Sequence, residues 1–252
     1  MITTVVTTRY VMPLREGGSL PAIIEADDKR LYVMKFRGAG QGVKALIAEL
    51  IGAEIARYLG LNVPQIVFAE LDESFGRIEG DEEIQDLLKA STGLNLAVTY
   101  LQEAITFDPI INKIDPLLAS KIVWLDSFLL NVDRTARNTN MLIWKGDLWL
   151  IDHGASLIFH HNWENGANGD RPFSLIKKHV LISKATKLDE ANELIKPLLN
   201  RSFFEKIVGL VPGQWLNLDK AFPSVDDNRL AYINFLVERL NYSDEFIKEA
   251  AQ

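Results

Sequence analysis

The spacing of apolar residues changes along this chain, and that change limits the possible folds more than any other feature of the sequence. Up to about residue 102, apolar residues occur in short runs rich in Val, Ile, Thr and aromatic residues, which favour β-strands. One stretch differs, because apolar residues recur at helical intervals from Val43 until Gly60 and Pro64. We expect the earliest runs to form a small antiparallel sheet. The expected strands cover residues 3–12, 21–26, 30–36, 65–71 and 94–102.

Helical spacing dominates from about Phe107 onward. A buried helix is expected over residues 116–133, because apolar residues recur there three and four positions apart. Further helical patterns cover residues 189–200, 202–211 and 227–252. The sequence therefore predicts an α+β chain with a small, mainly β N-terminal lobe, residues 1–102, and a larger, mainly α C-terminal lobe, residues 103–252.

Two segments of the C-terminal lobe lack the helical period. Residues 140–152 are typical of a β-hairpin that turns at Lys145-Gly146-Asp147. Residues 159–174 are dense in Asn, Gly and Asp, which predicts a long loop. Loops of this length inside compact proteins are uncommon and often functional.

Composition excludes several classes of protein. A formal net charge of −7 argues against a general nucleic-acid binder, which needs an excess of clustered Lys and Arg. The absence of cysteine excludes disulfides, thiolate metal sites and a cysteine nucleophile. We find neither a secretory signal pattern nor a run of the roughly 20 apolar residues that cross a bilayer. We therefore expect a soluble cytoplasmic protein without membrane contact.

Three polar residues around the expected hairpin suit a site for a divalent cation and phosphate. Asn138 follows Asp133 by five residues, and Asp152 lies at the far end of the hairpin. Magnesium prefers oxygen ligands, usually one or two protein groups together with water and substrate phosphates. Asp133 would orient an attacking hydroxyl or accept its proton, while Asn138 and Asp152 would bind the metal.

A simpler interpretation is an Asx-rich turn before a hairpin, because Asn and Asp occur in turns throughout proteins. Asn140 is a second candidate amide, and we expect it to brace the turn. The order of the wider pattern favours the catalytic interpretation: an apolar helix, the polar loop, the hairpin and then Ile151-Asp152-His153-Gly154.

The residues Asp133-Arg134-Thr135-Ala136-Arg137-Asn138, followed by Asp152-His153-Gly154, resemble the catalytic loop and metal-binding segment of the protein-kinase-like superfamily. They are most similar to its HipA-like and phosphatidylinositol-kinase-like branches. Thr135 stands where those branches have His, and His153 stands in the middle of the usual Asp-Phe-Gly. The resemblance implies a two-lobed kinase-like fold that binds ATP between the lobes.

The resemblance also implies a lysine that contacts the nucleotide phosphates and a helix carboxylate that holds it. Lys35 ends an expected strand and matches the lysine of the family's Val-Ala-Ile-Lys pattern. Glu49, in the helix that follows, is the chosen partner, and Glu54 points elsewhere on that helix. A solvent-exposed strand lysine and a solvent-exposed helix face are the competing interpretations.

The remaining nucleotide contacts are also implied by the resemblance. Gly17, Gly18 and Ser19 would cover the phosphates, since glycine lets the backbone approach them closely. A plain hairpin turn fits these residues as well. Tyr100 and Leu101, at the join of the two lobes, would bind adenine through their backbone.

The histidines do not predict a zinc site, because zinc needs several ligands on a defined scaffold and these lie largely in an irregular segment. We expect loop and surface histidines instead. They are His153, His160 and His161, with His179 too distant in sequence to place. Lys177 and Lys178 could contact phosphate or an acidic acceptor, but a solvated face is the usual explanation.

The function implied by the resemblance is ATP- and Mg²⁺-dependent phosphoryl transfer by a HipA-like protein Ser/Thr kinase. Two alternatives stay open: a small-molecule kinase of the same fold, and a nucleotide-binding pseudokinase or interaction module. ATP is the expected partner, a protein is the favoured acceptor, and the sequence predicts neither the acceptor's identity nor an oligomeric state.

Overall fold

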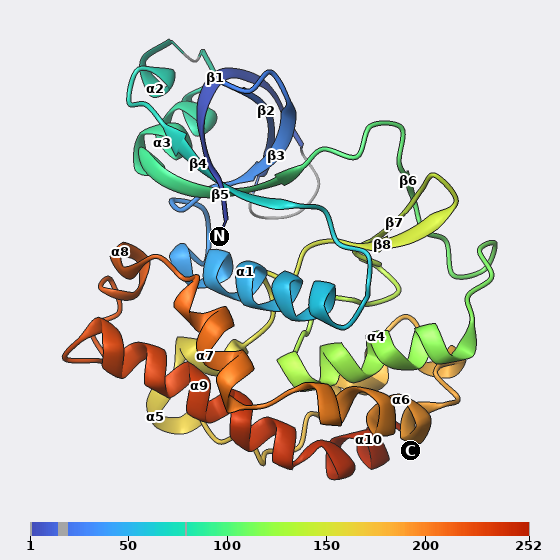
Figure 1. The fold of residues 1–252 in the computed structure, drawn as a ribbon. Coiled ribbons are helices and arrows are strands. Elements are labelled where there is room, and N and C mark those ends of the chain that lie inside the picture. The colour runs from blue at the N-terminus through green and yellow to red at the C-terminus, as the bar shows by residue number, and fades with distance from the viewer. Residues whose placement is uncertain (1, 15–19, 79, 252) are drawn as a thin grey trace. The chain divides into compact units, whose positions relative to one another are not determined.

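The computed structural model describes residues 2–14, 20–78 and 80–251, and the chain forms two compact units (Figure 1). Unit 1 comprises residues 1–50 and 64–103, and unit 2 comprises residues 51–63 and 104–252. The chain therefore enters unit 2 briefly before it completes unit 1. A functional lobe boundary at residue 102 stays a prediction.

Unit 1 is built on a closed five-stranded barrel (Figure 1). The expected antiparallel pairing of the first three strands is confirmed, whereas closure of the barrel was not expected. Closure depends on parallel pairing of the first and fourth strands. Alanines at Ala22, Ala69 and Ala97 are fully buried, so the narrow interior is filled in part by small side chains. In barrel order the strands are β1 (Thr4–Pro13), β2 (Ala22–Ala26), β3 (Leu31–Lys35), β5 (Gly93–Thr99) and β4 (Ile66–Leu71).

Helix α1 (Val43–Tyr58) begins in unit 1 and ends in unit 2. Its end is fixed by Gly60, which has a φ of +77° and allows the Leu61 N–H to donate to the Ala56 carbonyl at 3.0 Å. Two further helices of unit 1, α2 (Phe75–Ile78) and α3 (Glu82–Ala90), were not expected. The side chain of Asp81 caps α3 by accepting from the Glu83 N–H at 3.0 Å.

In unit 2, the segment that contains Asp133 connects a buried helix to a small sheet (Figure 1). Helix α4 (Pro116–Leu129) is capped by Asp115 and is almost wholly buried over its last ten residues, as its apolar spacing predicts. The expected hairpin is confirmed as β7 (Met141–Trp144) and β8 (Asp147–Leu150), with β6 (Ile105–Thr106) added at its edge. Lys145 and Gly146 have φ of 52° and 89°, as a two-residue hairpin turn requires.

The expectation of one loop over residues 159–174 is wrong in part, because short helical turns η1 and α5 lie there. The ring of Phe159 stacks on Phe235 with centroids 3.6 Å apart, which holds this segment against helix α9. The pattern over 227–252 divides into two helices at Tyr242. The remaining elements are η1 (Ile158–His161), α5 (Trp163–Gly166), η2 (Ser174–Lys178), η3 (Ile182–Lys184), α6 (Leu188–Ile195), η4 (Lys196–Leu198), α7 (Arg201–Gly209), α8 (Gly213–Leu216), α9 (Val225–Asn241) and α10 (Ser243–Ala251).

Aromatic side chains anchor α4 in the core of unit 2. Trp124 and Phe128 are fully buried and stack with ring centroids 5.2 Å apart, while Phe246 meets Trp124 edge-on at 5.4 Å. The buried guanidinium of Arg239 donates to the Ser127 carbonyl at 2.8 Å, near the end of the helix. The C-terminal end of α4 is therefore held firmly where the polar loop begins. Within the described part of the chain, no helix has the length and apolar character needed to span a membrane.

Candidate functional site

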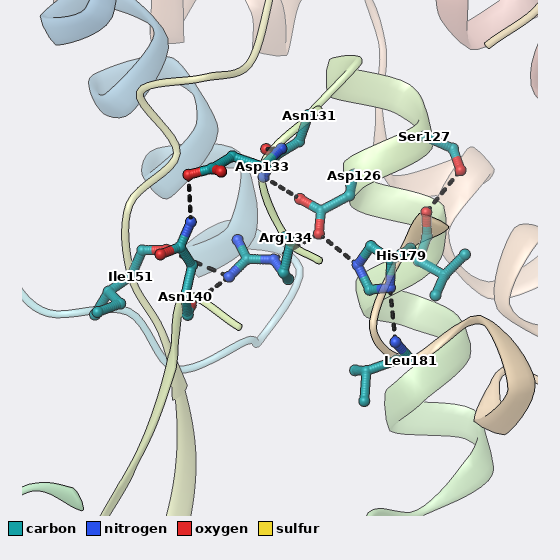
Figure 2. Close-up of polar contacts among 10 residues, drawn as sticks. Asp126, Ser127, Asn131, Asp133, Arg134, Asn140, Ile151, His179 and Leu181 are labelled. Carbon is teal, nitrogen blue, oxygen red and sulfur yellow. Dashed lines mark hydrogen bonds and ion pairs between the residues drawn. The ribbon is translucent and has the colours of Figure 1, made fainter. Parts of the chain in front are cut away.

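The candidate residue Asp133 lies in the connection between α4 and β7, residues 131–140, which we call the Asp133 loop. Its Oδ2 accepts hydrogen bonds from the side-chain amides of Asn138 at 2.7 Å and Asn140 at 3.0 Å. Figure 2 shows the Asn140 amide pointing at this carboxylate. The two candidate amides therefore converge on one oxygen of Asp133. Because each uses its nitrogen for this contact, each has its amide oxygen left to offer elsewhere.

Local hydrogen bonds give the Asp133 loop its shape. Helix α4 ends at Leu130 in the left-handed conformation, with φ of 55°. The side-chain oxygen of Asn131 accepts from the Asp133 N–H at 3.1 Å, and the Thr135 N–H donates to the Asn138 carbonyl at 2.9 Å. The first contact is an Asx turn, so the turn-forming and catalytic interpretations are compatible.

The buried carboxylate of Asp126, on α4, holds the Asp133 loop through hydrogen bonds. Asp126 accepts from the Arg134 Nε at 2.6 Å and the Asn131 side-chain amide at 2.9 Å, and neither Asp126 nor Arg134 has an exposed side chain. The Arg134 guanidinium also donates to the carbonyls of Asn140 and Ile151, so it ties the loop to both ends of the hairpin (Figure 2). We call Asp126, Asn131, Arg134 and His179 the Asp126 cluster.

Sequence reasoning missed Asp126, although the sequence contains a signal for it. Asp126 lies on the apolar helical pattern directly after Leu125, and a charge on a buried face requires a partner. Burial by itself would raise the pKa of Asp126, but the Arg134 charge and the His179 hydrogen bond outweigh it. The pKa of this carboxyl is therefore held well below its usual range.

Asp152 follows β8 at the base of the hairpin. The Ile151 N–H donates to the Asn140 carbonyl at 3.0 Å, and both Asn140 and Asp152 have positive φ, of 48° and 57°. Asn and Asp are the non-glycine residues that best tolerate this conformation. Asp152 is partly exposed, as an acid that contacts a ligand must be.

The candidate metal ligands suit a hard cation. Asn138 is exposed and has its amide nitrogen engaged by Asp133, so its oxygen is the atom it can offer to a metal. Among the residues that the structure describes, no group of three or more His, Cys, Asp or Glu side chains could hold a metal ion. One amide and one carboxylate oxygen, completed by water and phosphate oxygens, match the way magnesium is usually held. The ligand roles of Asn138 and Asp152 stay predictions.

The expectation of surface histidines is wrong for His153 and His160, whereas His179 had not been placed. His153, His160 and His179 are buried, and His161 is exposed. Polar contacts accompany the burial of two of them: a His160 ring nitrogen lies 2.9 Å from the Tyr232 hydroxyl, and His179 contacts Asp126.

Unit 1 contains a buried ion pair that joins the candidate lysine to α1. The Lys35 Nζ lies 2.6 Å from Oε2 of Glu49, and these side chains are only 16% and 3% exposed. Glu54 instead contacts Arg57 at 3.2 Å. The pair fixes the ammonium group at the end of β3. Its role in holding phosphate stays a prediction.

The residues expected to contact the nucleotide are Gly17, Gly18, Ser19, Tyr100 and Leu101. Gly17, Gly18 and Ser19 lie outside the described residues. The Tyr100 N–H donates to the Leu31 carbonyl at 3.1 Å, so that group is engaged within unit 1. Leu101 is buried. Adenine binding by Tyr100 and Leu101 stays a prediction.

Gly52 allows α1 to approach the segment of Asp152 within unit 2. A Cβ at this position would lie 2.8 Å from the Cβ of His153, well inside normal contact. We expect Gly52→Ala to lower the free energy of unfolding by about 1–2 kcal/mol, since the overpacking penalty exceeds the helix-propensity gain. Urea unfolding would measure the effect.

The matched control is Gly209→Ala, because a Cβ at Gly209 would meet nothing within 4 Å. Here only the gain in helix propensity applies, so stability should stay the same or rise. Equal effects of the two substitutions would refute the close approach of α1 to His153.

The family described as HipA-like kinase matches residues 8–250 of the chain. None of the curated proteins matches it. The chain is similar in structure to the proinflammatory kinase CtkA of Helicobacter pylori, with a TM-score of 0.56 and 13% identity, covering 98% of this chain and 96% of that chain. It is also similar to the Golgi casein kinase, with a TM-score of 0.48 and 10% identity, covering 100% of this chain and 75% of that chain. The expected kinase-like α+β fold, mainly β in its N-terminal part and mainly α in its C-terminal part, is confirmed, and the β part closes into a barrel.

Proposed function

Because the chain belongs to the HipA-like kinase family, we propose that it transfers the γ-phosphoryl group of ATP to a Ser or Thr hydroxyl of a protein in the cytoplasm. The observation that carries the proposal is the Asp133 carboxylate, held by the Asn138 and Asn140 amides above a fully buried Asp126–Arg134 ion pair. A carboxylate fixed in this way can orient a hydroxyl and accept its proton. The choice of a protein acceptor follows the family resemblance.

Each candidate residue has a distinct role in this proposal. Asp133 aligns the acceptor hydroxyl and takes its proton at a carboxylate oxygen, which favours in-line attack. Asn138 and Asp152 would hold Mg²⁺ through oxygen atoms, and bound Mg²⁺ neutralises charge on the phosphates. Lys35 steadies the phosphates, and its contact with Glu49 at 2.6 Å restricts where its ammonium group can lie.

Labelled ATP offers a direct test of the proposal. Purified protein would be incubated with γ-labelled ATP and Mg²⁺, and then with protein and metabolite fractions of a cell lysate separately. We expect label on protein Ser or Thr, and none when EDTA removes the metal. Label only on a small molecule would favour the small-molecule kinase. ATP binding without label transfer or hydrolysis would make the chain a pseudokinase.

The Lys35–Glu49 pair gives a second prediction. We expect Glu49→Gln to weaken ATP binding about tenfold or more, because a hydrogen bond between charged groups contributes about 1.5–3 kcal/mol. Glutamine keeps the length of the side chain and one oxygen that can accept from Lys35, but it removes the charge and replaces the other oxygen by an NH₂ group. Titration with a fluorescent ATP analogue would measure the change.

Glu54→Gln is the matched control on the same helix. Glu54 pairs with Arg57 instead of Lys35, so its loss should leave ATP affinity unchanged. If both substitutions weaken binding equally, a general effect on α1 accounts for the result and the phosphate role of Lys35 is wrong.

A further inference from the structure

His179 is a buried histidine whose protonation pattern follows from its contacts. Its Nδ1 accepts from the Leu181 N–H at 3.0 Å, so Nδ1 carries no proton. In the neutral ring the proton is therefore on Nε2, which lies 2.8 Å from Oδ2 of Asp126. Burial lowers the pKa of His179 although Asp126 opposes this, so the ring is neutral near pH 7. His179 is thus a fixed donor to Asp126 (Figure 2).

The Asp126 carboxylate connects this donor to Asp133. Its Oδ1 accepts from the Asn131 side-chain amide at 2.9 Å, and the Asn131 side-chain oxygen accepts from the Asp133 N–H at 3.1 Å. A chain of hydrogen bonds therefore runs from His179 through Asp126 and Asn131 to the Asp133 backbone (Figure 2). Each hydrogen bond along this path has one donor and one acceptor, so the orientation of each group depends on its neighbour.

The backbone around His179 contacts the two residues that follow Asp133 in the loop. Thr135 and His179 form an antiparallel bridge, and the Val180 N–H donates to the Arg134 carbonyl at 3.1 Å. The segment 176–180 thus meets the Asp133 loop through backbone and side chain together. A histidine that merely filled space would not need both ring nitrogens engaged in directed hydrogen bonds.

We propose that His179 is a positioning residue for Asp133 and acts through Asp126, so that the segment 176–180 sets the geometry of the Asp133 loop. This inference rests on the proposed function, because positioning matters for catalysis only if Asp133 orients the acceptor. It assigns a role to a residue that the sequence pattern could not place.

Two substitutions separate the two ring nitrogens. In His179→Gln the amide nitrogen reaches the place of Nε2 and can still donate to Asp126, whereas the contact with Leu181 is lost. In His179→Asn the amide oxygen stands in for Nδ1 and keeps the Leu181 contact, but the side chain is too short to reach Asp126. A purely structural role would make the two variants similar.

We expect His179→Asn to lower kcat about tenfold to a hundredfold through misplacement of Asp133. The KM for ATP should change little, and His179→Gln should retain most of the native kcat. Hydrogen exchange measured by mass spectrometry gives a readout independent of activity. Amides of residues 131–135 should exchange about tenfold faster in His179→Asn than in His179→Gln, since one supporting hydrogen bond is lost. Exchange in α4 serves as the internal reference.

The outcomes are distinguishable. Equal loss of kcat in both variants, or loss in neither, would overturn the positioning role, as would equal exchange rates in residues 131–135. If the native protein transfers no phosphoryl group and hydrolyses no ATP, the proposed function is wrong. The exchange comparison then still decides whether His179 orders the Asp133 loop.

Discussion

Replacing Asp133 by asparagine is expected to slow phosphoryl transfer by about a hundredfold to ten-thousandfold, the usual contribution of a positioned general base. Asparagine has almost the same shape, and its side-chain oxygen can still accept from the Asn138 and Asn140 amides. It cannot take a proton from the acceptor hydroxyl. The loss should therefore appear in kcat, with the affinity for ATP nearly unchanged. Single-turnover label transfer would measure it.

Asp133→Asn is preferable to Asp133→Ala for this test. Alanine would leave the amide of Asn140, which is only 8% exposed, without its acceptor. That loss costs about 1–3 kcal/mol and would mix a folding effect with the catalytic one. Turnover by Asp133→Asn at the native rate would exclude Asp133 as the base.

Replacing Asp126 by asparagine is expected to lower the free energy of unfolding by about 3–5 kcal/mol, because it leaves the buried Arg134 charge uncompensated. The side-chain groups that contact Asp126 are all donors, from Asn131, Arg134 and His179. In Asp126→Asn, the side-chain NH₂ group would replace one of the two accepting oxygens and would therefore point at one of these donors. Urea unfolding at pH 7 would measure the change.

The matched control is Asp226→Asn. Asp226 pairs with Arg229 at 3.2 Å, but its side chain is 92% exposed, so solvent screens the pair. We expect little change in stability. If both substitutions lowered the free energy of unfolding by a similar amount, burial of the Asp126–Arg134 pair would not account for the loss.

The stabilisation by Asp126 should also depend on pH. Its pKa is lower in the folded chain than in the unfolded chain, so the unfolded state binds more protons as the pH falls. The contribution is fully present above the unfolded pKa of about 4 and is lost as the pH falls further. The stability gap between the native protein and Asp126→Asn should therefore be constant from neutral pH to about 5 and shrink below about 4.

The fold was largely predictable because local patterns dominate it. Apolar runs identified the barrel strands, and the turn residues Lys145 and Gly146 identified the hairpin. Closure of the barrel was not predictable, because β1 and β4 pair across more than fifty residues of sequence and no local pattern encodes that contact. Helix α3 was missed because it is short and has few buried apolar residues.

The candidate site was predictable only where its residues form a compact motif. Asp133, Asn138 and Asp152 lie within one loop and hairpin, so their spacing carried the inference. The Asp126 cluster was not found, because His179 comes 53 residues after Asp126 and meets it only through tertiary packing. The need for glycine at position 52 was not predictable either, because it arises from close packing against His153, which is distant in the sequence.

The path of α1 has a consequence for attempts to study parts of this protein. Residues 51–63 belong to unit 2, yet residues 64–103 return to unit 1. A fragment that began at residue 104 would lack Tyr58, whose ring stacks on Phe203 at 4.2 Å, and Asn62, which donates to the Leu148 carbonyl. No single truncation point therefore yields unit 2 intact, and a fragment that ended at residue 103 would carry residues 51–63 without the rest of the unit to which they belong.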